Sequence, residues 1–301
     1  MNWLQQKKAV FAGCARDSAP HLPALFANIE RMAALFGKSA FVFAENGSVD
    51  STRDDLEAWC RARADAGVLS PDARAAASNL RSVRVGGARN AYLSLIRAIF
   101  ADFDYLIVLD MDDANTLPLA MDGFVRALEF LEADGRRAGV FANSLGIYYD
   151  MWALRHPTLC PGDVWEEVCD YALNHGVDDK AAFAATLGRR IFTLKPDAPP
   201  LEVDCAFGGL GLYRLRPVLE NPQPFMGMRR KQLSPALAAR LGFADATGAV
   251  GWHICEHVPF HAGLREVGGK LFILPWLINR HAGAHGFEPS AWRSFMLDIR
   301  S

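Results

Sequence analysis

The chain has 301 residues, 51% of them hydrophobic, and is therefore long enough to bury a sizeable core. Its 32 lysines and arginines nearly balance 34 aspartates and glutamates, which argues against a nucleic-acid-binding protein, since that class usually carries a basic excess. No apolar run is long enough to span a bilayer and no secretory signal is evident, so we expect a cytoplasmic protein with at most peripheral membrane association.

The first third of the chain alternates between strand and helix patterns. Short apolar runs rich in β-favouring residues are followed by segments with apolar residues at helical spacing. This alternation predicts an α/β fold with a mostly parallel central sheet and helices on both faces. The predicted strands are 8–14, 39–44, 80–85 and 105–109, and the predicted helices are 22–36, 51–63 and 88–101.

Polar clusters adjoin the ends of these predicted strands. Because the carboxyl ends of parallel strands meet at one edge of a sheet, we expect the clusters to form a common ligand site there. The clusters are residues 12–17, 45–50, 86–90 and 110–113.

The second half of the chain has weaker patterns. We predict strands at 138–143 and 191–194, a helix at 165–173, a glycine-rich turn at 204–214 and a strand ending at Pro275. No linker or repeat is visible, so residues 1–301 are predicted to form one domain. Six scattered cysteines without metal or redox spacing are predicted to be reduced and mostly buried.

Asp110 and Asp112 directly follow the apolar strand at 105–109. Because side chains at the end of an extended segment alternate with a period of two, both carboxylates can point to the same side. Hard oxygen ligands of this kind suit Mg²⁺ or Mn²⁺, which can bridge a diphosphate. A solvated acidic turn is the alternative, but the position at the end of a buried strand favours a metal site.

Two more segments complete a resemblance to nucleotide-sugar glycosyltransferases of the A-type fold, which is Rossmann-like. Residues 45–52 (ENGSVDST) resemble the segment after the second strand of these enzymes. Residues 86–91 (GGARNA), followed by a helix and the Asp110–Asp112 motif, resemble the run that leads to their metal site. Residues 45–52 are also similar to the capsule-type mannosyltransferases of fungi.

The resemblance implies roles for individual residues, and each has a structural alternative. The alternatives are an ordinary polar turn at residues 45–47, a salt bridge on a helix face at Arg89, and a tight turn between strands at residues 208–209. The implied positions are Ala12, Arg16 and Glu45 at the nucleoside, Arg89 and Asn90 near the diphosphate, Asp110 and Asp112 at Mn²⁺ or Mg²⁺, and Gly208 and Gly209 beneath the transferred sugar.

Residues 252–257 (WHICEH) resemble the acceptor-side segment of the same family, in which a carboxylate takes the proton from the acceptor hydroxyl. His257 stands where an aspartate is usual, so either Glu256 or His257 is the expected base. His257 and His261 have the spacing of a metal pair, but Pro259 makes a regular helical pair doubtful and a dedicated zinc site improbable. His281 or His285 is a better candidate for a third ligand of the metal at Asp110 and Asp112.

A group of aromatic residues in the middle of the chain suits either stacking on acceptor sugars or a place in the core. The group consists of Phe141, Tyr148, Tyr149, Trp152 and Trp165.

These observations predict a metal-dependent transferase that moves a sugar from a nucleotide-diphosphate donor to a saccharide or glycan acceptor, and the resemblance implies that the sugar is a hexose. Surface polysaccharide synthesis is one role in keeping with the resemblance. Residues 1–120 would bind the donor and the metal, and residues 121–301 would form the acceptor side. The alternatives are a nucleotidyltransferase acting on a sugar phosphate and a non-catalytic carbohydrate-binding protein.

Overall fold

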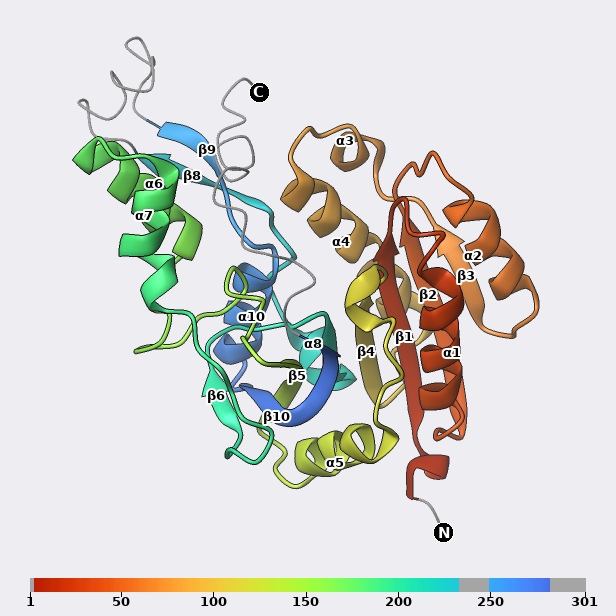
Figure 1. Ribbon diagram of the computed structural model, residues 1–301. Coiled ribbons are helices and arrows are strands. Elements are labelled where there is room, and N and C mark those ends of the chain that lie inside the picture. Colours follow the sequence, from red (N-terminus) through yellow and green to blue (C-terminus); the bar gives the residue numbers. More distant parts are fainter. Residues whose placement is uncertain (1–2, 233–248, 282–301) are drawn as a thin grey trace.

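The computed structural model describes residues 3–232 and 249–281. Within these residues eight strands form one sheet, in the order β3-β2-β1-β4-β7-β5-β10-β6 (Figure 1). Six strands run in one direction, and β6 and β7 run against them. The strands are β1 (Lys8–Ala15), β2 (Lys38–Glu45), β3 (Ala66–Leu69), β4 (Tyr105–Asp110), β5 (Arg137–Leu145), β6 (Leu201–Val203), β7 (Leu210–Arg214) and β10 (Lys270–His281).

Helices cover both faces of this sheet, so the predicted α/β class with a mostly parallel sheet is confirmed (Figure 1). One core lies under α1 (Leu22–Ala33), α2 (Thr52–Arg61) and α5 (Met121–Glu132). A second core lies on the opposite face. Its helices are α4 (Arg81–Ile99), α6 (Val164–His175), α7 (Asp179–Ala185), α8 (Leu215–Glu220) and α10 (His257–Glu266).

The remaining elements are short. A two-stranded antiparallel ribbon, β8 (Met228–Gln232) with β9 (Ala249–His253), lies apart from the main sheet. The one-turn helix α3 (Ala73–Ala76) precedes α4, and three 3₁₀ turns complete the described residues. These turns are η1 (Trp3–Gln6), η2 (Asp113–Asn115) and η3 (Leu187–Arg189).

The carboxyl ends of β1, β2 and β4 meet at one edge of the sheet, as the alternating pattern predicts. The register pairs Cys14 with Asp110 across β1 and β4, and Ala15 with Glu45 across β1 and β2. Strand polarity therefore brings the polar clusters at 12–17, 45–50 and 110–113 together, although long stretches of chain separate them.

Three sequence predictions about elements are wrong. Residues 80–85 are not a strand, because α4 begins at Arg81 and continues to Ile99. Residues 191–194 contribute only an isolated bridge between Thr193 and Ile147. β10 does not end at Pro275, since the strand passes through an irregular stretch and pairs with β5 again as far as His281.

The six cysteines are free thiols, and five of them are buried, as predicted. Among the helices within residues 3–232 and 249–281, none is both long and apolar enough to cross a membrane.

Candidate active site

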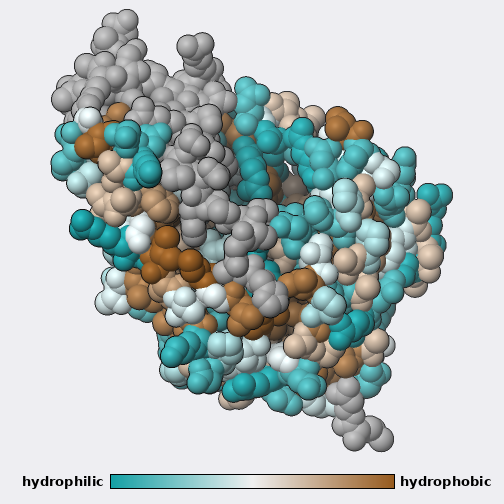
Figure 2. Space-filling view, in the orientation of Figure 1, coloured by the Kyte–Doolittle hydropathy of each residue, from teal (hydrophilic) through white to brown (hydrophobic). Residues whose placement is uncertain are grey.

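A cavity of about 220 Å³ opens at the shared edge of β1, β2 and β4. Its walls come from the ends of β1 and β4 and from one face of α4, and we call it the arginine pocket. Figure 2 shows a hollow near α4 with hydrophilic residues around it. The lining residues are Cys14, Ala15, Arg16, Asp17, Ser18, Asn46, Arg81, Arg84, Val85, Ala88, Arg89, Asp110, Met111 and Asp112.

Asp110 and Asp112 both line this pocket; Met111 between them also contacts it but is 1% exposed and packs in the core under α1, α2 and α5. The alternation expected at the end of a strand therefore holds through this motif. Asp112 also caps η2, where its Oδ1 accepts a hydrogen bond of 3.0 Å from the backbone N–H of Ala114. The backbone N–H of Asp110 donates to the carbonyl of Gly209 at 2.8 Å, which fixes the end of β4.

The carboxyl of Asp110 carries an electrostatic strain that a cation would relieve. Its side chain is 32% exposed, and the rest is enclosed by protein. Burial and the neighbouring charge of Asp112 raise the pKa of Asp110 to about 7, although Arg89 acts in the opposite direction. Two carboxylates that lie in one pocket provide oxygen ligands of the kind that hold a divalent cation.

Three arginines from different segments face the same pocket. Arg81 and Arg84 lie on the first turn of α4, and Arg16 follows β1. Burial and the charges of Arg16 and Arg81 lower the pKa of Arg84, so the three cations repel one another in the absence of an anion. Guanidinium groups bind phosphate oxygens through charge-assisted and often bidentate hydrogen bonds. The pocket therefore places a polyanion-binding wall beside a pair of carboxylates.

The resemblance did not point to Arg81 and Arg84. A strand over 80–85 would have put these two side chains on opposite faces, because side chains alternate in a strand. In a helix, residues three and four apart share a face, and residues 81, 84, 85 and 88 all line the pocket. A basic pair at helical spacing was the available signal, but it depended on the correct element.

Arg89 lies at the centre of the site. The predicted helix at 88–101 would put it at a helix start, but it falls in the middle of α4. Its Nη2 donates to Asp110 Oδ1 at 3.1 Å, and its Nε donates to Glu256 Oε1 at 3.1 Å. The rings of Phe207 and Phe225 lie 4.8 and 5.7 Å from its guanidinium carbon.

Burial alone would lower the pKa of Arg89, but the surrounding groups, Tyr92, Cys14, Glu256 and Asp110, raise it. Arg89 is thus a permanent cation that joins two carboxylates. Arg89 does form the salt bridges of the structural alternative, with Asp110 and Glu256, although it is buried. Its place in the pocket wall is compatible with contact to a diphosphate, which stays a prediction.

Glu256 and His257 are brought to this site from the far end of the sequence, where Glu256 directly precedes α10. The side chain of Glu256 is 6% exposed and is held by Arg89. His257 is also buried, and no hydrogen-bond partner is found for either ring nitrogen among the described residues. Burial, Arg89 and His261 keep the pKa of His257 well below its ordinary value, so its imidazole is neutral.

His257 and His261 do share a face of α10, with ring centroids 5.3 Å apart. Pro259 does not prevent this, because it lies in the first turn of the helix, where proline is tolerated. His261 is engaged on both nitrogens, 2.9 Å from the hydroxyl of Tyr213 and 3.0 Å from Sγ of Cys205. Burial and Arg89 lower the pKa of His261 to about 3.

The residues present fit a Mg²⁺ or Mn²⁺ ion whose coordination shell would be completed by substrate. No group of three His, Cys, Asp or Glu side chains suited to a metal occurs within residues 3–232 and 249–281. Mg²⁺ is commonly bound by one or two carboxylates together with substrate phosphates, and Asp110 and Asp112 provide such a pair. The side chain of His281 and the whole of His285 lie outside the described part of the chain, so a third ligand there stays a prediction.

Comparisons with known proteins were made for both the sequence and the structure. No protein-family model and no curated protein matches the chain. Among solved structures it is similar to mannosyltransferase PcManGT from Pyrobaculum calidifontis in complex with GDP-Man and Mn²⁺, at 14% identity and a TM-score of 0.48. That match covers 96% of this chain and 60% of PcManGT.

Two further structures have similar scores. Residues 1–349 of S. aureus TarS in complex with UDP-GlcNAc match at 13% identity and a TM-score of 0.47, over 95% of this chain and 61% of that chain. Glucosyl-3-phosphoglycerate synthase from Mycobacterium tuberculosis in complex with UDP matches at 12% identity and a TM-score of 0.44. That match covers 96% of this chain and 76% of the synthase chain. The chain therefore spans about 60% of the length of the first two. At this low similarity we take the function from the site described above.

Several residues that the resemblance placed at the donor have structural roles instead. Ala12 is 0% exposed and packs in the core under α4, because it precedes by two residues Cys14, the point where β1 reaches the pocket. Asn90 binds the backbone of Phe225 twice, through Nδ2 to the carbonyl at 2.8 Å and through Oδ1 from the N–H at 2.9 Å. It therefore fastens α4 to the segment before β8.

The glycines at 208 and 209 are buried, and their place beneath the sugar stays a prediction. Both have positive φ, at 67° and 79°. A Cβ on Gly208 would lie 2.3 Å from the carbonyl oxygen of Ala142, and one on Gly209 would lie 2.7 Å from the hydroxyl of Tyr149. Close packing against protein backbone and side chains explains the glycines, which is the alternative of a tight turn between strands.

Glu45 builds the turn beside the pocket and does not line it, whereas its neighbour Asn46 does. Its Oε1 accepts from the backbone N–H of Ser48 at 2.6 Å, and its Oε2 pairs with Arg53 at 3.3 Å. The role of Glu45 at a nucleoside remains a prediction.

The central aromatic residues divide between core and surface. Phe141 and Tyr148 are fully buried, with Phe141 stacked on His261 and Tyr148 on Phe192. Tyr149 and Trp152 are partly exposed and remain available for stacking.

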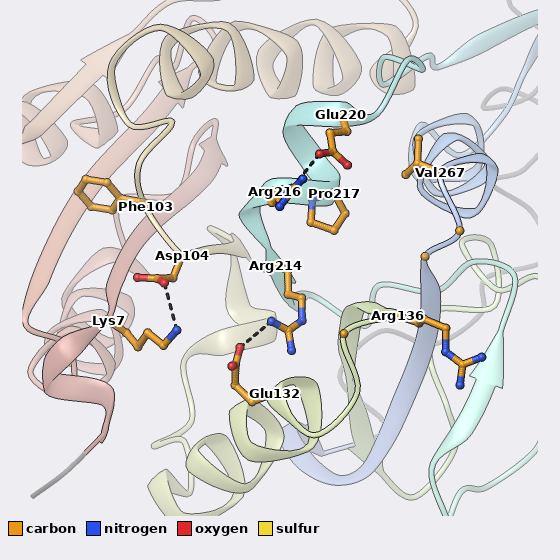
Figure 3. Close-up of a pocket in the computed structure, with 13 residues that line it drawn as sticks. Lys7, Phe103, Asp104, Glu132, Arg136, Arg214, Arg216, Pro217, Glu220 and Val267 are labelled. Carbon is orange, nitrogen blue, oxygen red and sulfur yellow. Dashed lines mark hydrogen bonds and ion pairs between the residues drawn. The ribbon is translucent and has the colours of Figure 1, made fainter.

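A second cavity of about 500 Å³ lies at the opposite edge of the sheet, where the parallel strands begin (Figure 3). Three of its cations point at acids of the same cavity: Lys7 at Asp104, Arg214 at Glu132, and Arg216 at Glu220. These charges are neutralised in pairs. In the arginine pocket Arg16 also pairs with Asp17, at 3.6 Å, but no ion pair is found for Arg81 or Arg84 within residues 3–232 and 249–281.

Proposed function

We propose that this chain is a metal-dependent glycosyltransferase that moves a sugar from a nucleotide-diphosphate donor to a saccharide or glycan acceptor. The observation that carries the proposal is the arginine pocket, which Arg16, Arg81 and Arg84 line together with Asp110 and Asp112. A diphosphate would neutralise the arginines on one side and would share a cation with the carboxylates on the other.

A divalent cation held by Asp110 and Asp112 would stabilise the negative charge that develops on the departing nucleoside diphosphate. The arginines of the pocket bind and orient the same phosphates. Arg89 orients both Asp110 and Glu256, so it sets the distance between the donor side and the acceptor side. If the reaction inverts the sugar, Glu256 takes the proton from the acceptor hydroxyl; if configuration is retained, Glu256 orients the acceptor instead.

The first test is nucleotide binding by isothermal titration calorimetry. We expect UDP or GDP to bind at least tenfold more tightly with Mn²⁺ than with chelator, because the ion bridges phosphate and carboxylates. Arg84→Gln should weaken this binding about tenfold, the range for one charge-assisted hydrogen bond. Arg61→Gln, on the exposed surface of α2, is the matched control and should leave binding unchanged.

Equal affinity with and without Mn²⁺, or equal affinity of the Arg84 and Arg61 variants, would contradict the proposal. The products then separate the two enzyme classes. A glycosyltransferase releases a nucleoside diphosphate from its donor, whereas a nucleotidyltransferase releases pyrophosphate from a nucleoside triphosphate. A protein that binds sugars without catalysis would release neither.

A further inference from the structure

Arg280 is a buried cation near the end of β10, and its side chain lacks an acidic partner in the part of the chain that the structure describes. The residue is 4% exposed, and within residues 3–232 and 249–281 no hydrogen-bond partner is found for its Nε and Nη1. The other buried arginine of the site, Arg89, is held by two carboxylates. An ionised group that is removed from water without a counter-charge is costly, so Arg280 requires an explanation.

The side chain of Arg280 lies over the ring of Tyr149, with its guanidinium carbon 4.0 Å from the ring centroid. This cation–π contact offsets part of the cost of burial but leaves the two nitrogens without acceptors. Its neighbour Asn279 donates to Asn115 Oδ1 at 2.9 Å and to the carbonyl of Gly208 at 2.7 Å. Asn115 in turn donates to the carbonyl of Asp110 at 2.9 Å, so the end of β10 is tied to the metal-binding loop.

Arg280 nevertheless does not line the arginine pocket. The pocket is built from β1, β4 and α4, whereas Arg280 and Tyr149 belong to β10 and to the segment after β5. In the sheet, β4 lies between β1 on one side and β7, β5 and β10 on the other. A diphosphate in the arginine pocket would therefore lie toward the β1 side of β4, whereas the strand that carries Arg280 lies beyond β7 and β5.

From this arrangement we propose that Arg280 binds an anionic group, a phosphate or a carboxylate, carried by the acceptor. A guanidinium fork fits the planar or tetrahedral oxygens of such groups through paired, charge-assisted hydrogen bonds. The inference rests on the proposed function, because it assigns the acceptor to the side of Asp110 that the nucleotide does not occupy. It restricts the acceptor to a negatively charged saccharide or glycan.

The test uses the full chain saturated with UDP or GDP and Mn²⁺, so that the arginine pocket is filled. Glucose 6-phosphate and glucuronate are then compared with glucose by calorimetry. We expect at least one of the charged sugars to bind tenfold or more tightly than glucose in the wild type, and Arg280→Gln to abolish the difference. Arg280→Lys should keep part of it, because the charge remains but the fork is lost.

Arg265→Gln is the matched control, since this arginine lies on α10, pairs with Asp204 at 2.7 Å and should leave sugar binding unchanged. Thermal unfolding of each variant verifies that it is folded. The inference is overturned if both charged sugars bind no more tightly than glucose, or if Arg280→Gln weakens UDP and GDP binding instead. Failure of the proposed function has a different signature, namely no Mn²⁺-dependent nucleotide binding by the wild type.

Discussion

Glu256 is deeply buried and pairs with Arg89 at 3.1 Å, and this makes its chemistry easy to test. Glu256→Gln keeps the shape of the side chain and an oxygen that can accept from Arg89, but it removes the ability to take a proton. If Glu256 is the base, turnover should fall by about two to four orders of magnitude. Donor affinity should change little, because the base acts on the acceptor. The measurement is the transfer rate beside nucleotide affinity.

His257→Ala supplies the comparison. The neutral imidazole of His257 has no partner among the described residues, but it lies 3.7 Å from Glu256 Oε1. A larger loss of turnover in this variant than in Glu256→Gln would assign the base to the histidine. Near-normal turnover in Glu256→Gln would exclude Glu256 as the base.

Asp112→Asn separates metal binding from folding at a single residue. Asparagine is as good a helix cap as aspartate, so the hydrogen bond to Ala114 and the η2 turn should survive. The variant loses one anionic metal ligand, and we expect most Mn²⁺-dependent nucleotide binding to be lost while the circular dichroism spectrum is unchanged. A large drop in the midpoint of thermal unfolding would instead show that Asp112 is structural.

At the scale of elements, α4 organises the site because it lines the pocket with one face and carries the buried cation Arg89. Its place depends on contacts with the segment before β8. Gly227 allows the closest approach, since a Cβ there would lie 2.1 Å from the backbone carbon of Ser82. The hydroxyl of Ser82 also donates to the carbonyl of Gly227 at 2.7 Å.

Asn90→Ala should therefore loosen α4 from the rest of the protein. The variant loses two hydrogen bonds to the backbone of Phe225, each worth about 1 kcal/mol, so the free energy of unfolding should fall by about 2 kcal/mol. Ser94→Ala, on the exposed surface of the same helix, is the control and should change it by less than about 0.5 kcal/mol. Urea denaturation measures the free energy of unfolding of both variants. Equal values would show that the hydrogen bonds of Asn90 to Phe225 do not hold α4 in place.

For the whole molecule, the buried histidines of α10 predict a dependence of stability on pH. The folded protein holds His257 and His261 neutral, with the pKa of His261 lowered to about 3, whereas in the unfolded chain both titrate near 6.5. Below pH 6.5 the unfolded chain binds more protons than the folded one, so acid favours unfolding. Each histidine should lower the free energy of unfolding by up to about 1.4 kcal/mol per pH unit as the pH falls.

This expectation can be checked by urea denaturation between pH 7.5 and pH 5. The contribution of His257 and His261 to the free energy of unfolding should be nearly constant above pH 7 and should decline below it. His261→Gln should be less stable at neutral pH, because it disturbs the contacts with Tyr213 and Cys205, but its stability should decline less steeply with acid. An equally steep decline in this variant would show that other groups cause the acid sensitivity.

The α/β class and the strands β1, β2 and β4 could be predicted from the sequence alone, and so could the shared side of Asp110 and Asp112. These features depend on periodicity, which is a property of residues close together in the chain. The sequence did not predict β3, and its strand at 80–85 was wrong. The sequence also placed Arg89 and Glu256 among the candidates, but through resemblance rather than through any local pattern.

Which of these residues contact one another follows from the tertiary structure and not from the sequence pattern. Arg89 and Glu256 are 167 positions apart, and their contact follows from how α4 and α10 pack on the same face of the sheet. The burial of Ala12 and the role of Asn90 as a clamp likewise depend on neighbours that are distant in sequence. Arg280 shows the same limit most clearly, because nothing beside it in the chain predicts that its charge is buried with no acidic partner among the described residues. The order of strands in a sheet sets such contacts, and hydropathy patterns along the chain do not encode that order.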